Sequence, residues 1–234
     1  MKPPRGAAVA AFLLEFYGSH SRICKRLMRL MPAIGVTGGI STGKTSFCQA
    51  LRAIIPDAKF FDADEAAHRL TDLDPRVKKE IRDGFGAEVF SADGHLNREK
   101  LRAIVFGSAT KKRALEQILH PRIRRQWSVE AEKHRNSPEF FFADIPLLYE
   151  TSAETLCDRV VVVACSSRIQ LRWLMERMSL GRAAAEQMIN SQMPLDEKIS
   201  RADHVVWNND NPAALAAQAR FLVSLWQKES WTKS

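Results

Sequence analysis

The sequence predicts an α/β fold in which a five-stranded parallel sheet is flanked by helices. Two features lead to this prediction. Short apolar runs alternate with longer stretches that have helical spacing, and a glycine-rich turn joins the first run to the first helical stretch. Parallel strands need long crossover connections, usually helices, and they are buried on both faces. Alternation of this kind therefore indicates a parallel sheet with helices on both sides.

Five apolar runs are the expected strands. They are AIGVT (33–37), AKFFDAD (58–64), EFFFADIP (139–146), DRVVVVAC (158–165) and HVVWN (204–208). The expected helices cover residues 45–55, 74–83, 98–107, 109–135 and 212–228, and charged helical sequence fills 166–201. Proline inside a helix removes a hydrogen bond and clashes with the preceding turn, so Pro121 is expected to break or kink the long helix.

Residues 1–30 differ in composition from the rest of the chain. They hold six basic residues and one acidic residue, and so carry +5 of the formal charge of +8. Their apolar run is too short to span a bilayer, and no transmembrane segment is expected. Three interpretations stay open: a targeting leader, which we favour, a helix on a membrane surface, or a translation start at Met31.

The remaining residues, 31–230, suit one medium-sized domain, expected to be a monomer or a weak oligomer. Their mildly basic charge fits a phosphate-rich small ligand better than a nucleic acid. The four cysteines have neither zinc-site nor redox-motif spacing. We therefore expect reduced thiols in an intracellular compartment, cytoplasmic or mitochondrial.

The glycine-rich turn matches the phosphate-loop pattern G-x-x-x-x-G-K-[ST] in full, as Gly38-Gly39-Ile40-Ser41-Thr42-Gly43-Lys44-Thr45. It follows an expected strand and opens an expected helix, which is the context that the motif requires. Its successive N–H groups would form an anion-binding nest at a helix N-terminus. Lys44 is expected to reach the β- and γ-phosphates of a nucleoside triphosphate, and the Thr45 hydroxyl to ligate Mg²⁺. A structural glycine turn is the alternative.

A small kinase fits this length of chain. Switch GTPases usually carry a guanine-reading N-K-x-D signal, and the sequence contains none. Phosphoryl transfer needs positioning, charge neutralisation and a group that accepts the proton of the acceptor hydroxyl. Such a group should lie at the carboxyl ends of the strands, where ligands bind in open α/β sheets.

Three carboxylates lie at expected strand ends. Asp62 and Asp64 share one face if the second strand continues through them. On spacing alone, Asp64 is equally an N-cap for the helical sequence EAAHRL, and Asp62 is more easily explained as structural. Asp144 ends the third apolar run and is a candidate Mg²⁺ ligand, with a solvated strand end as the alternative.

Further motifs occur in an order that resembles the dephospho-CoA kinase family. TGGISTGKT is followed by FDADEAAHRL, LHPRI (119–123), DIPLLYE (144–150), and Q-M-P-L-x-x-K with ADHVVWNN. The resemblance covers about residues 33–226. It implies a P-loop kinase fold with ATP and Mg²⁺ as cofactors. It also implies phosphorylation of the ribose 3′-hydroxyl of dephospho-CoA, the last step of coenzyme A synthesis.

The resemblance implies roles for several of these residues. Asp64 matches the catalytic base, with Asp62 beside it on the substrate side, and Asp144 matches the metal-binding carboxylate. Asn208 matches the asparagine at the adenine-side strand end, where a plain turn residue is the alternative. Glu150 would orient a basic side chain, or be a solvated charge.

The acceptor site is expected to involve a helical sub-domain at about 74–135. His120 and Pro121 match the motif of that region, and Leu147 and Leu148 would wall the acceptor pocket. A packing histidine, a helix kink or start and ordinary core leucines are the respective alternatives.

The stretch at about 166–201 is expected to be a mobile lid that brings guanidinium groups to the phosphates. Arg177 is the expected catalytic cation because it matches the last arginine of the family's Q-x-x-R-x-x-x-R pattern. The chain departs from the pattern at Trp173 and Met188, which stand where the family has arginine. A solvated helical face is the alternative for most arginines here.

Two other functions remain open at this point. If neighbours such as Arg172 and Arg182 do not replace the missing cations, ATP handling would be weaker, as in a nucleotide-binding regulatory module without turnover. A different small-molecule kinase, such as a nucleoside kinase, is the other alternative. The presence of Asp64 favours phosphoryl transfer over simple binding.

Overall fold

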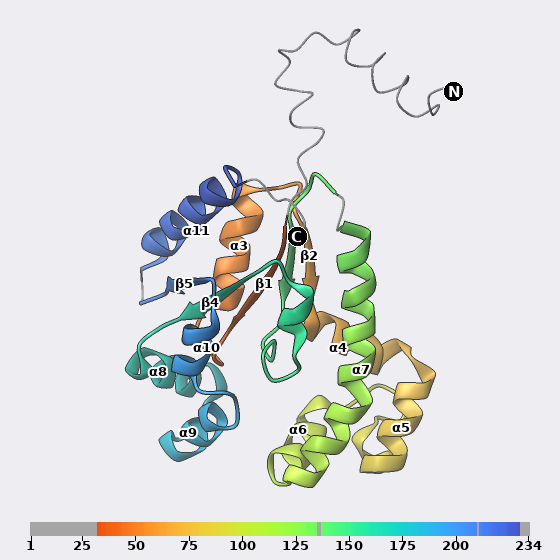
Figure 1. The fold of residues 1–234 in the computed structure, drawn as a ribbon. Coiled ribbons are helices and arrows are strands. Elements are labelled where there is room, and N and C mark those ends of the chain that lie inside the picture. Colours follow the sequence, from red (N-terminus) through yellow and green to blue (C-terminus); the bar gives the residue numbers. More distant parts are fainter. Residues whose placement is uncertain (1–31, 135–136, 210, 230–234) are drawn as a thin grey trace, which may run out of the picture.

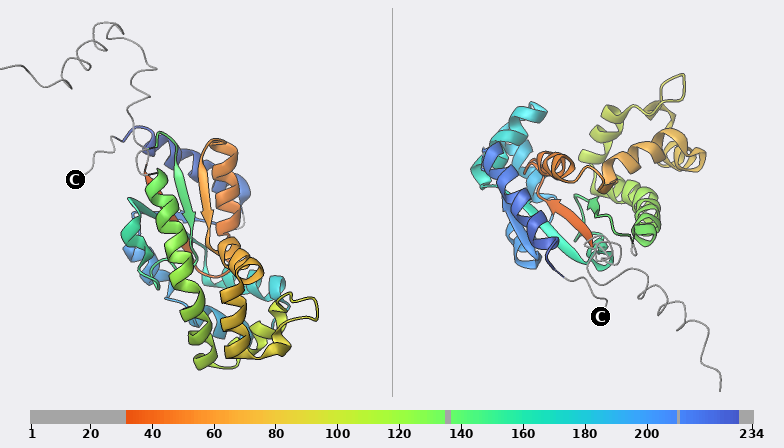
Figure 2. Two further views of the ribbon diagram at one scale, coloured as in Figure 1. Left: turned by 90° about the vertical axis from the view of Figure 1, so that its right-hand side faces the viewer. Right: turned by 90° about the horizontal axis from the view of Figure 1, so that it is seen from above.

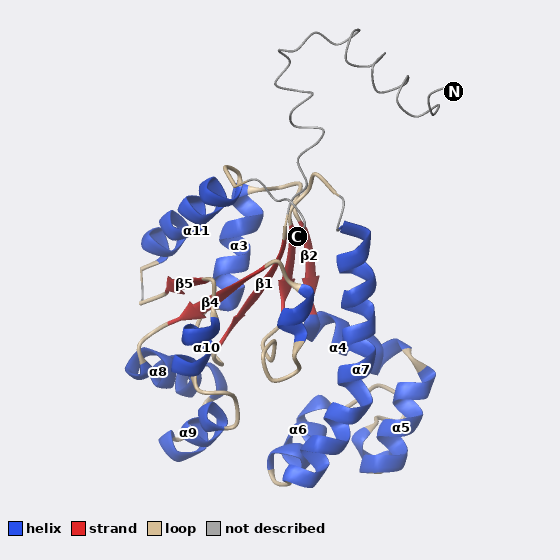
Figure 3. Ribbon diagram, in the orientation of Figure 1, coloured by secondary structure: helices blue, strands red, loops and turns tan. Residues whose placement is uncertain are grey.

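The computed structural model describes residues 32–134, 137–209 and 211–229, so the predictions for residues 1–30 lie outside the described residues (Figures 1 and 3). The strands form one sheet in the order β2-β3-β1-β4-β5, and every pairing is parallel. They are β1 (Ala33–Gly38), β2 (Lys59–Asp62), β3 (Phe141–Asp144), β4 (Arg159–Ala164) and β5 (His204–Trp207). The predicted five-stranded parallel sheet flanked by helices is confirmed.

The described helices also follow the predicted alternation. They are α3 (Lys44–Ile54), α4 (Ala63–Leu73), α5 (Pro75–Phe85), α6 (Arg98–Phe106), α7 (Ala109–His134), α8 (Ser167–Met178), α9 (Arg182–Asn190), α10 (Leu195–Arg201) and α11 (Pro212–Trp226). Two short 3₁₀ turns, Ala87–Val89 and Ala153–Leu156, complete the list. Within the described ranges, no helix is both long and apolar enough to cross a bilayer.

Alternate residues of each strand pack on opposite faces of the sheet, as a pleated strand requires. On one face, Phe142 joins a core cluster that includes residues of α3 and α11. On the other face, Phe141 packs with Trp127 of α7 and with residues of α4. Because both faces are covered, the strands are apolar throughout, which is why the sequence shows uninterrupted apolar runs.

The second strand is shorter than predicted. Residues 63 and 64 were expected to continue it, but β2 ends at Asp62 and Ala63 begins α4. The Asp62 side chain accepts a hydrogen bond from the Glu65 N–H at 2.9 Å, and so caps the new helix. The N-cap is therefore Asp62, not Asp64, and Asp64 lies in the first turn of α4.

The long helix is not broken at Pro121. Helix α7 continues from Ala109 to His134 through the proline, so of the predicted break or kink the break is wrong, and the kink stays a prediction. The Arg122 guanidinium donates to the Ile118 carbonyl at 2.6 Å and to Glu80 of α5 at 2.6 Å. The contact with Glu80 ties this part of the helix to α5.

Two groups of helices lie beyond the carboxyl ends of the strands, on opposite sides of β1 (Figure 1). One contains α8 and α9, and the other contains α5, α6 and the first part of α7; Figure 2 shows the same separation from above. The second group has a core cluster of its own, which includes Val77, Ile81 and Phe85.

Candidate active site

The phosphate loop connects β1 to α3 at the carboxyl end of the central strand. Gly43 has a left-handed backbone with φ 92°, and a Cβ there would lie 2.0 Å from the Nδ2 atom of Asn208. A Cβ at Gly38 would lie 2.3 Å from the Val163 carbonyl oxygen. Both positions therefore require glycine, because no side chain fits between the loop and the strands beside it.

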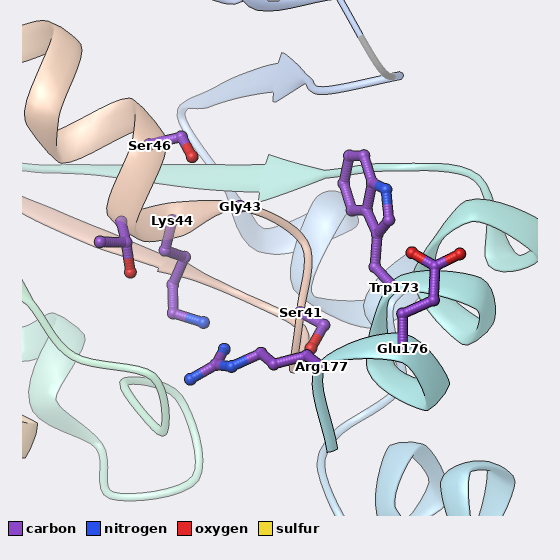
Figure 4. Close-up of a pocket in the computed structure, with 8 residues that line it drawn as sticks. Ser41, Gly43, Lys44, Ser46, Trp173, Glu176 and Arg177 are labelled. Carbon is purple, nitrogen blue, oxygen red and sulfur yellow. The ribbon is translucent and has the colours of Figure 1, made fainter. Parts of the chain in front are cut away.

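Lys44 lies in a cavity of about 540 Å³ above this loop. Its Nζ donates to the Gly39 carbonyl at 3.1 Å. Arg177 of α8 lines the same cavity, and Figure 4 shows the Lys44 and Arg177 side chains pointing toward one another from opposite walls. Two cations that converge beside a nest of backbone N–H groups make a site for a polyphosphate.

The other lid arginines do not join this cavity. Arg172 lies 4.0 Å from Glu176, and Arg182 lies 2.8 Å from Glu186; each pair is one turn apart on its own helix. Trp173, which stands where the family pattern has arginine, lines the cavity beside Lys44 instead. The alternative in which Arg172 and Arg182 replace the missing cations has no support in this geometry.

A second cavity, of about 610 Å³, lies between α4, α7 and the loop after β3. It brings together four of the predicted site residues: Asp64, His120, Pro121 and Leu147. Most of its lining is apolar, and burial lowers the pKa of His120. The cavity can therefore take a large, partly apolar ligand and present it to the Asp64 carboxylate.

Two residues predicted for the substrate side do not line this cavity. Leu148 is fully buried in the core, where a Cβ added at Gly35 would lie 2.7 Å from its Cδ1. The prediction that both leucines wall the cavity is thus corrected for Leu148, which fills the core beneath it. Asp62 caps α4, as described above, and it faces a different hollow on the β2 side of the sheet.

Asp64 and Asp144 lie close enough to Lys44 for their charges to interact with it. Burial, and secondly the charge of Asp62, raise the pKa of Asp64 above its ordinary value, while Lys44 opposes the shift. Burial raises the pKa of Asp144 to about 6, again against the effect of Lys44. Burial lowers the pKa of Lys44, and the two carboxylates oppose this. Charge interactions therefore connect Lys44 of the first cavity with Asp64 of the second cavity and with Asp144 at the end of β3.

Comparison with known proteins decides which family this arrangement represents. A model of the dephospho-CoA kinase family matches residues 32–214. The chain is 42% identical over 195 residues to the dephospho-CoA kinase of Anaeromyxobacter dehalogenans, covering 83% of this chain and 92% of that protein. The chain belongs to the dephospho-CoA kinase family. It is therefore a kinase, and the reaction of this family is the ATP-dependent phosphorylation that completes coenzyme A biosynthesis.

Two solved structures are similar to this chain, and one of them is a dephospho-CoA kinase. The dephospho-CoA kinase from Campylobacter jejuni is 25% identical, with a TM-score of 0.59 over 83% of this chain and 96% of that chain. The protein TT1252 from Thermus thermophilus is 27% identical, with a TM-score of 0.68 over 86% of this chain and all of that chain.

Two residues predicted to contact the nucleotide, Asn208 and Ile40, take part in hydrogen bonds that fix the phosphate loop. The Asn208 side chain is buried, and its Nδ2 donates to the Thr42 carbonyl at 3.1 Å. The Ile40 N–H donates to Gln192, and the Ile40 carbonyl accepts from Gln170. In this member of the dephospho-CoA kinase family, the backbone polar groups of Ile40 are thus already paired within the protein.

Sequence reasoning missed the most buried charge of the site. The Lys198 side chain is fully buried, and its Nζ lies 2.8 Å from a Glu150 carboxylate oxygen. It also donates to the carbonyls of Pro146 at 3.0 Å and Gly38 at 3.4 Å. Lys198 therefore joins the phosphate loop, the loop after β3 and α10. The signal was present in the family motifs, which contain both Lys198 and Glu150, but only the fold shows that they pair.

Replacing Lys198 with methionine should lower the free energy of unfolding by about 2–3 kcal/mol, because the partly exposed Glu150 carboxylate loses its cation and two carbonyls lose a donor. Urea unfolding followed by circular dichroism measures this. The double variant Lys198→Met/Glu150→Gln should be more stable than Lys198→Met, since it removes the unpaired charge. A Lys198→Met variant as stable as the wild type would contradict this role.

Proposed function

We propose that the site transfers the γ-phosphoryl group of ATP, bound in the cavity beside Lys44, to the ribose 3′-hydroxyl of dephospho-CoA, bound in the cavity beside Asp64. The observation that carries the proposal is the position of Asp64. It lines the acceptor cavity while its charge interacts with Lys44 of the phosphate loop. Donor and acceptor would therefore meet between these two side chains.

On the donor side, the phosphates would lie against the N–H groups at the start of α3. Lys44 would neutralise charge on the β- and γ-phosphates, and Arg177 would approach from the opposite wall of the cavity. Because the Lys44 ammonium and the loop are held in place before the substrate arrives, they stabilise the developing charge without reorganising. The helices α8 and α9 would act as the lid over this cavity.

On the acceptor side, the helices between residues 74 and 135 would form the acceptor sub-domain. The walls of the cavity are largely apolar and suit the adenine and pantetheine parts of dephospho-CoA, with His120, Pro121 and Leu147 among them. Lys112 and Arg124 also line it and would attract the diphosphate of the substrate. A cavity of about 610 Å³ is in the range that binds ligands of this kind.

Asp64 would act as the base. Its carboxylate would accept the proton of the 3′-hydroxyl as the oxygen attacks phosphorus, and Lys44 would keep it ionised before the step. The burial that raises the pKa of Asp64 also makes it a better proton acceptor. Activity should consequently fall as the pH decreases through the pKa of this group.

The residues present fit a magnesium ion. The Asp144 Oδ1 atom is buried and has no hydrogen-bond partner among the described residues, while Oδ2 accepts a hydrogen bond from Cys48 at 3.6 Å. Thr45 lines the donor cavity at the start of α3. We propose that these two side chains hold Mg²⁺, directly or through water, and that the ion neutralises charge on the β- and γ-phosphates when it is bound.

Changing Asp144 to asparagine should raise the Mg²⁺ concentration needed for half-maximal activity by about ten-fold or more, because the side chain loses its charge. A titration of the initial rate against Mg²⁺ at saturating ATP measures the change. The matched control is Asp57→Asn, at an exposed position, which should leave the titration unaltered. An unchanged Mg²⁺ requirement in Asp144→Asn would exclude Asp144 as a ligand.

The test of the function is a turnover assay with ATP, Mg²⁺ and dephospho-CoA, in which the product is identified by mass. Formation of coenzyme A and ADP in equal amounts supports the proposal. Phosphorylation of a nucleoside but not of dephospho-CoA would favour the nucleoside-kinase alternative. ATP binding without ADP formation would favour the regulatory module, for which the absence of arginine at Trp173 and Met188 is the supporting feature.

The leader hypothesis for residues 1–30 remains a proposal that rests on their basic composition. Cell fractionation would compare a fluorescent fusion of the full chain with one that starts at Met31. A targeting leader would be supported if the full-length fusion were mitochondrial and the fusion that starts at Met31 were cytoplasmic. Identical distribution would exclude it.

A monomer or weak oligomer also remains a proposal, which sedimentation velocity would test.

A further inference from the structure

Two glutamines from distant parts of the chain hold one peptide of the phosphate loop. The Gln170 Nε2, on α8, donates to the Ile40 carbonyl at 2.9 Å. The Gln192 Oε1, between α9 and α10, accepts from the Ile40 N–H at 3.1 Å. Both backbone polar groups of Ile40 are thus paired with side chains that belong to the predicted lid segment. We call this arrangement the Ile40 clamp.

The chemistry of the two contacts is opposite. A backbone carbonyl only accepts and a backbone N–H only donates, so Gln170 must present its amide nitrogen and Gln192 its amide oxygen. This orientation follows from the partners themselves. The same isosteric substitution, glutamine to glutamate, therefore removes the donor that Gln170 supplies but keeps the acceptor that Gln192 supplies.

The clamp acts on a strained part of the loop. Ser41, the next residue after Ile40, has a left-handed backbone with φ 56°, which is unfavourable for a residue with a side chain. Such a conformation persists only when its surroundings fix it. A Cβ at Gly39 would lie 2.5 Å from the Gln170 Nε2, so the residue before Ile40 is packed closely against the same amide.

The clamp also sets the position of Arg177. Gln170 and Arg177 are seven residues apart on α8, which is nearly two helical turns and places them on the same side of the helix. The Gln170 side chain is buried, with 4% of its surface exposed, whereas Arg177 lies in the donor cavity. Because the Gln170 contact ties α8 to the phosphate loop, it also fixes the position of Arg177, two turns further along the helix, relative to Lys44.

We propose that Gln170 and Gln192 are positioning residues for phosphoryl transfer, which hold the Ile40 peptide from two sides and thereby align the phosphate loop with Arg177. The segment expected as a lid is then divided. Helix α10, which carries the buried Lys198, and the part of α8 from Gln170 to Arg177 belong to the fixed part of the site, and the chain between Arg177 and Gln192 is left to move over ATP. This inference rests on the proposed function.

The experiment compares four isosteric variants, Gln170→Glu, Gln170→Met, Gln192→Glu and Gln192→Met, with the wild type. We expect both methionine variants and Gln170→Glu to lose about ten-fold or more in kcat/KM for ATP, since each leaves a backbone group of Ile40 unpaired. Gln192→Glu keeps the acceptor and should retain more activity than Gln192→Met. The KM for dephospho-CoA should change little in all four, because the clamp lies on the donor side.

Gln227→Glu is the matched control, because Gln227 is exposed at the end of α11, outside the lid, and the change adds the same charge. Its activity should equal that of the wild type. Thermal unfolding separates a misaligned phosphate loop from a less stable protein. A variant that unfolds at the wild-type temperature but has an altered KM and kcat for ATP supports a positioning role for the glutamine. Equal loss in Gln192→Glu and Gln170→Glu, or wild-type kinetics in both methionine variants, would overturn the clamp.

Binding of ATP, measured by calorimetry, keeps this test separate from the test of function. If the wild type produced no coenzyme A, the proposed function would fail, but the clamp would still predict weaker ATP binding in Gln170→Glu than in Gln192→Glu. If the wild type produced coenzyme A and the four variants bound ATP and turned over like it, only the clamp would fail.

Discussion

Replacing Lys44 with alanine should lower kcat by about 10²–10³-fold, with a smaller effect on ATP binding. The ammonium group is held beside the phosphate site by the Gly39 carbonyl and faces Arg177 across the cavity. Its charge interacts most strongly with the phosphates when negative charge develops on the transferred group, so its loss costs more in the transition state than in the bound complex. Steady-state kinetics with ATP and dephospho-CoA measures both parameters.

The matched control for this variant is Lys79→Ala. Lys79 is an exposed residue of α5 that pairs with Asp83, far along the chain from the loop. Its removal should leave kcat unaltered. Circular dichroism of Lys44→Ala checks that the fold is intact. A variant that is folded and turns over at the wild-type rate would refute the assignment of Lys44 to the phosphate site.

Asp64→Asn should retain ATP binding but lose about 10²–10⁴-fold in kcat, because an amide cannot accept the proton of the acceptor hydroxyl. The wild type should also lose activity as the pH falls, since the raised pKa of Asp64 brings its protonation closer to neutrality. In Asp64→Asn, the remaining activity should no longer show this acid limb. The pH dependence of kcat, measured for both proteins, tests the assignment.

Asp62→Asn separates the two carboxylates. Asparagine caps helices about as well as aspartate, so α4 should stay intact and most of the activity should remain. The charge of Asp62 contributes to the raised pKa of Asp64, so its removal should lower that pKa and move the acid limb to lower pH. If Asp62→Asn were as inactive as Asp64→Asn, the roles assigned here to the two residues would be wrong.

Local patterns were sufficient to predict much of this protein. The phosphate loop is specified by glycines whose neighbours, the Val163 carbonyl and Asn208, leave no room for a side chain. The strands are visible because a sheet covered on both faces needs continuous apolar runs. Asp64 could be predicted as a base only through the resemblance, because spacing alone left a helix cap equally plausible.

The resemblance also grouped residues that the fold separates. Leu147 and Leu148 are neighbours in one motif, yet Leu147 lines the acceptor cavity and Leu148 fills the core. Asp62 and Asp64 are two residues apart, but α4 begins between them. Asp62 therefore caps the helix, whereas Asp64 lines the acceptor cavity. Such divisions depend on where a strand ends and which side of a turn faces the core.

The sequence by itself determined the order of strands and helices along the chain and the residue types of the phosphate loop, because these follow from short-range periodicity and from backbone geometry. The tertiary structure alone decided which distant residues hold that loop. Gln192 and Lys198 lie more than 150 positions from the phosphate-loop backbone groups that they contact. No local pattern encodes such pairings, since they exist only after the sheet has brought the carboxyl ends of β1 and its neighbours together.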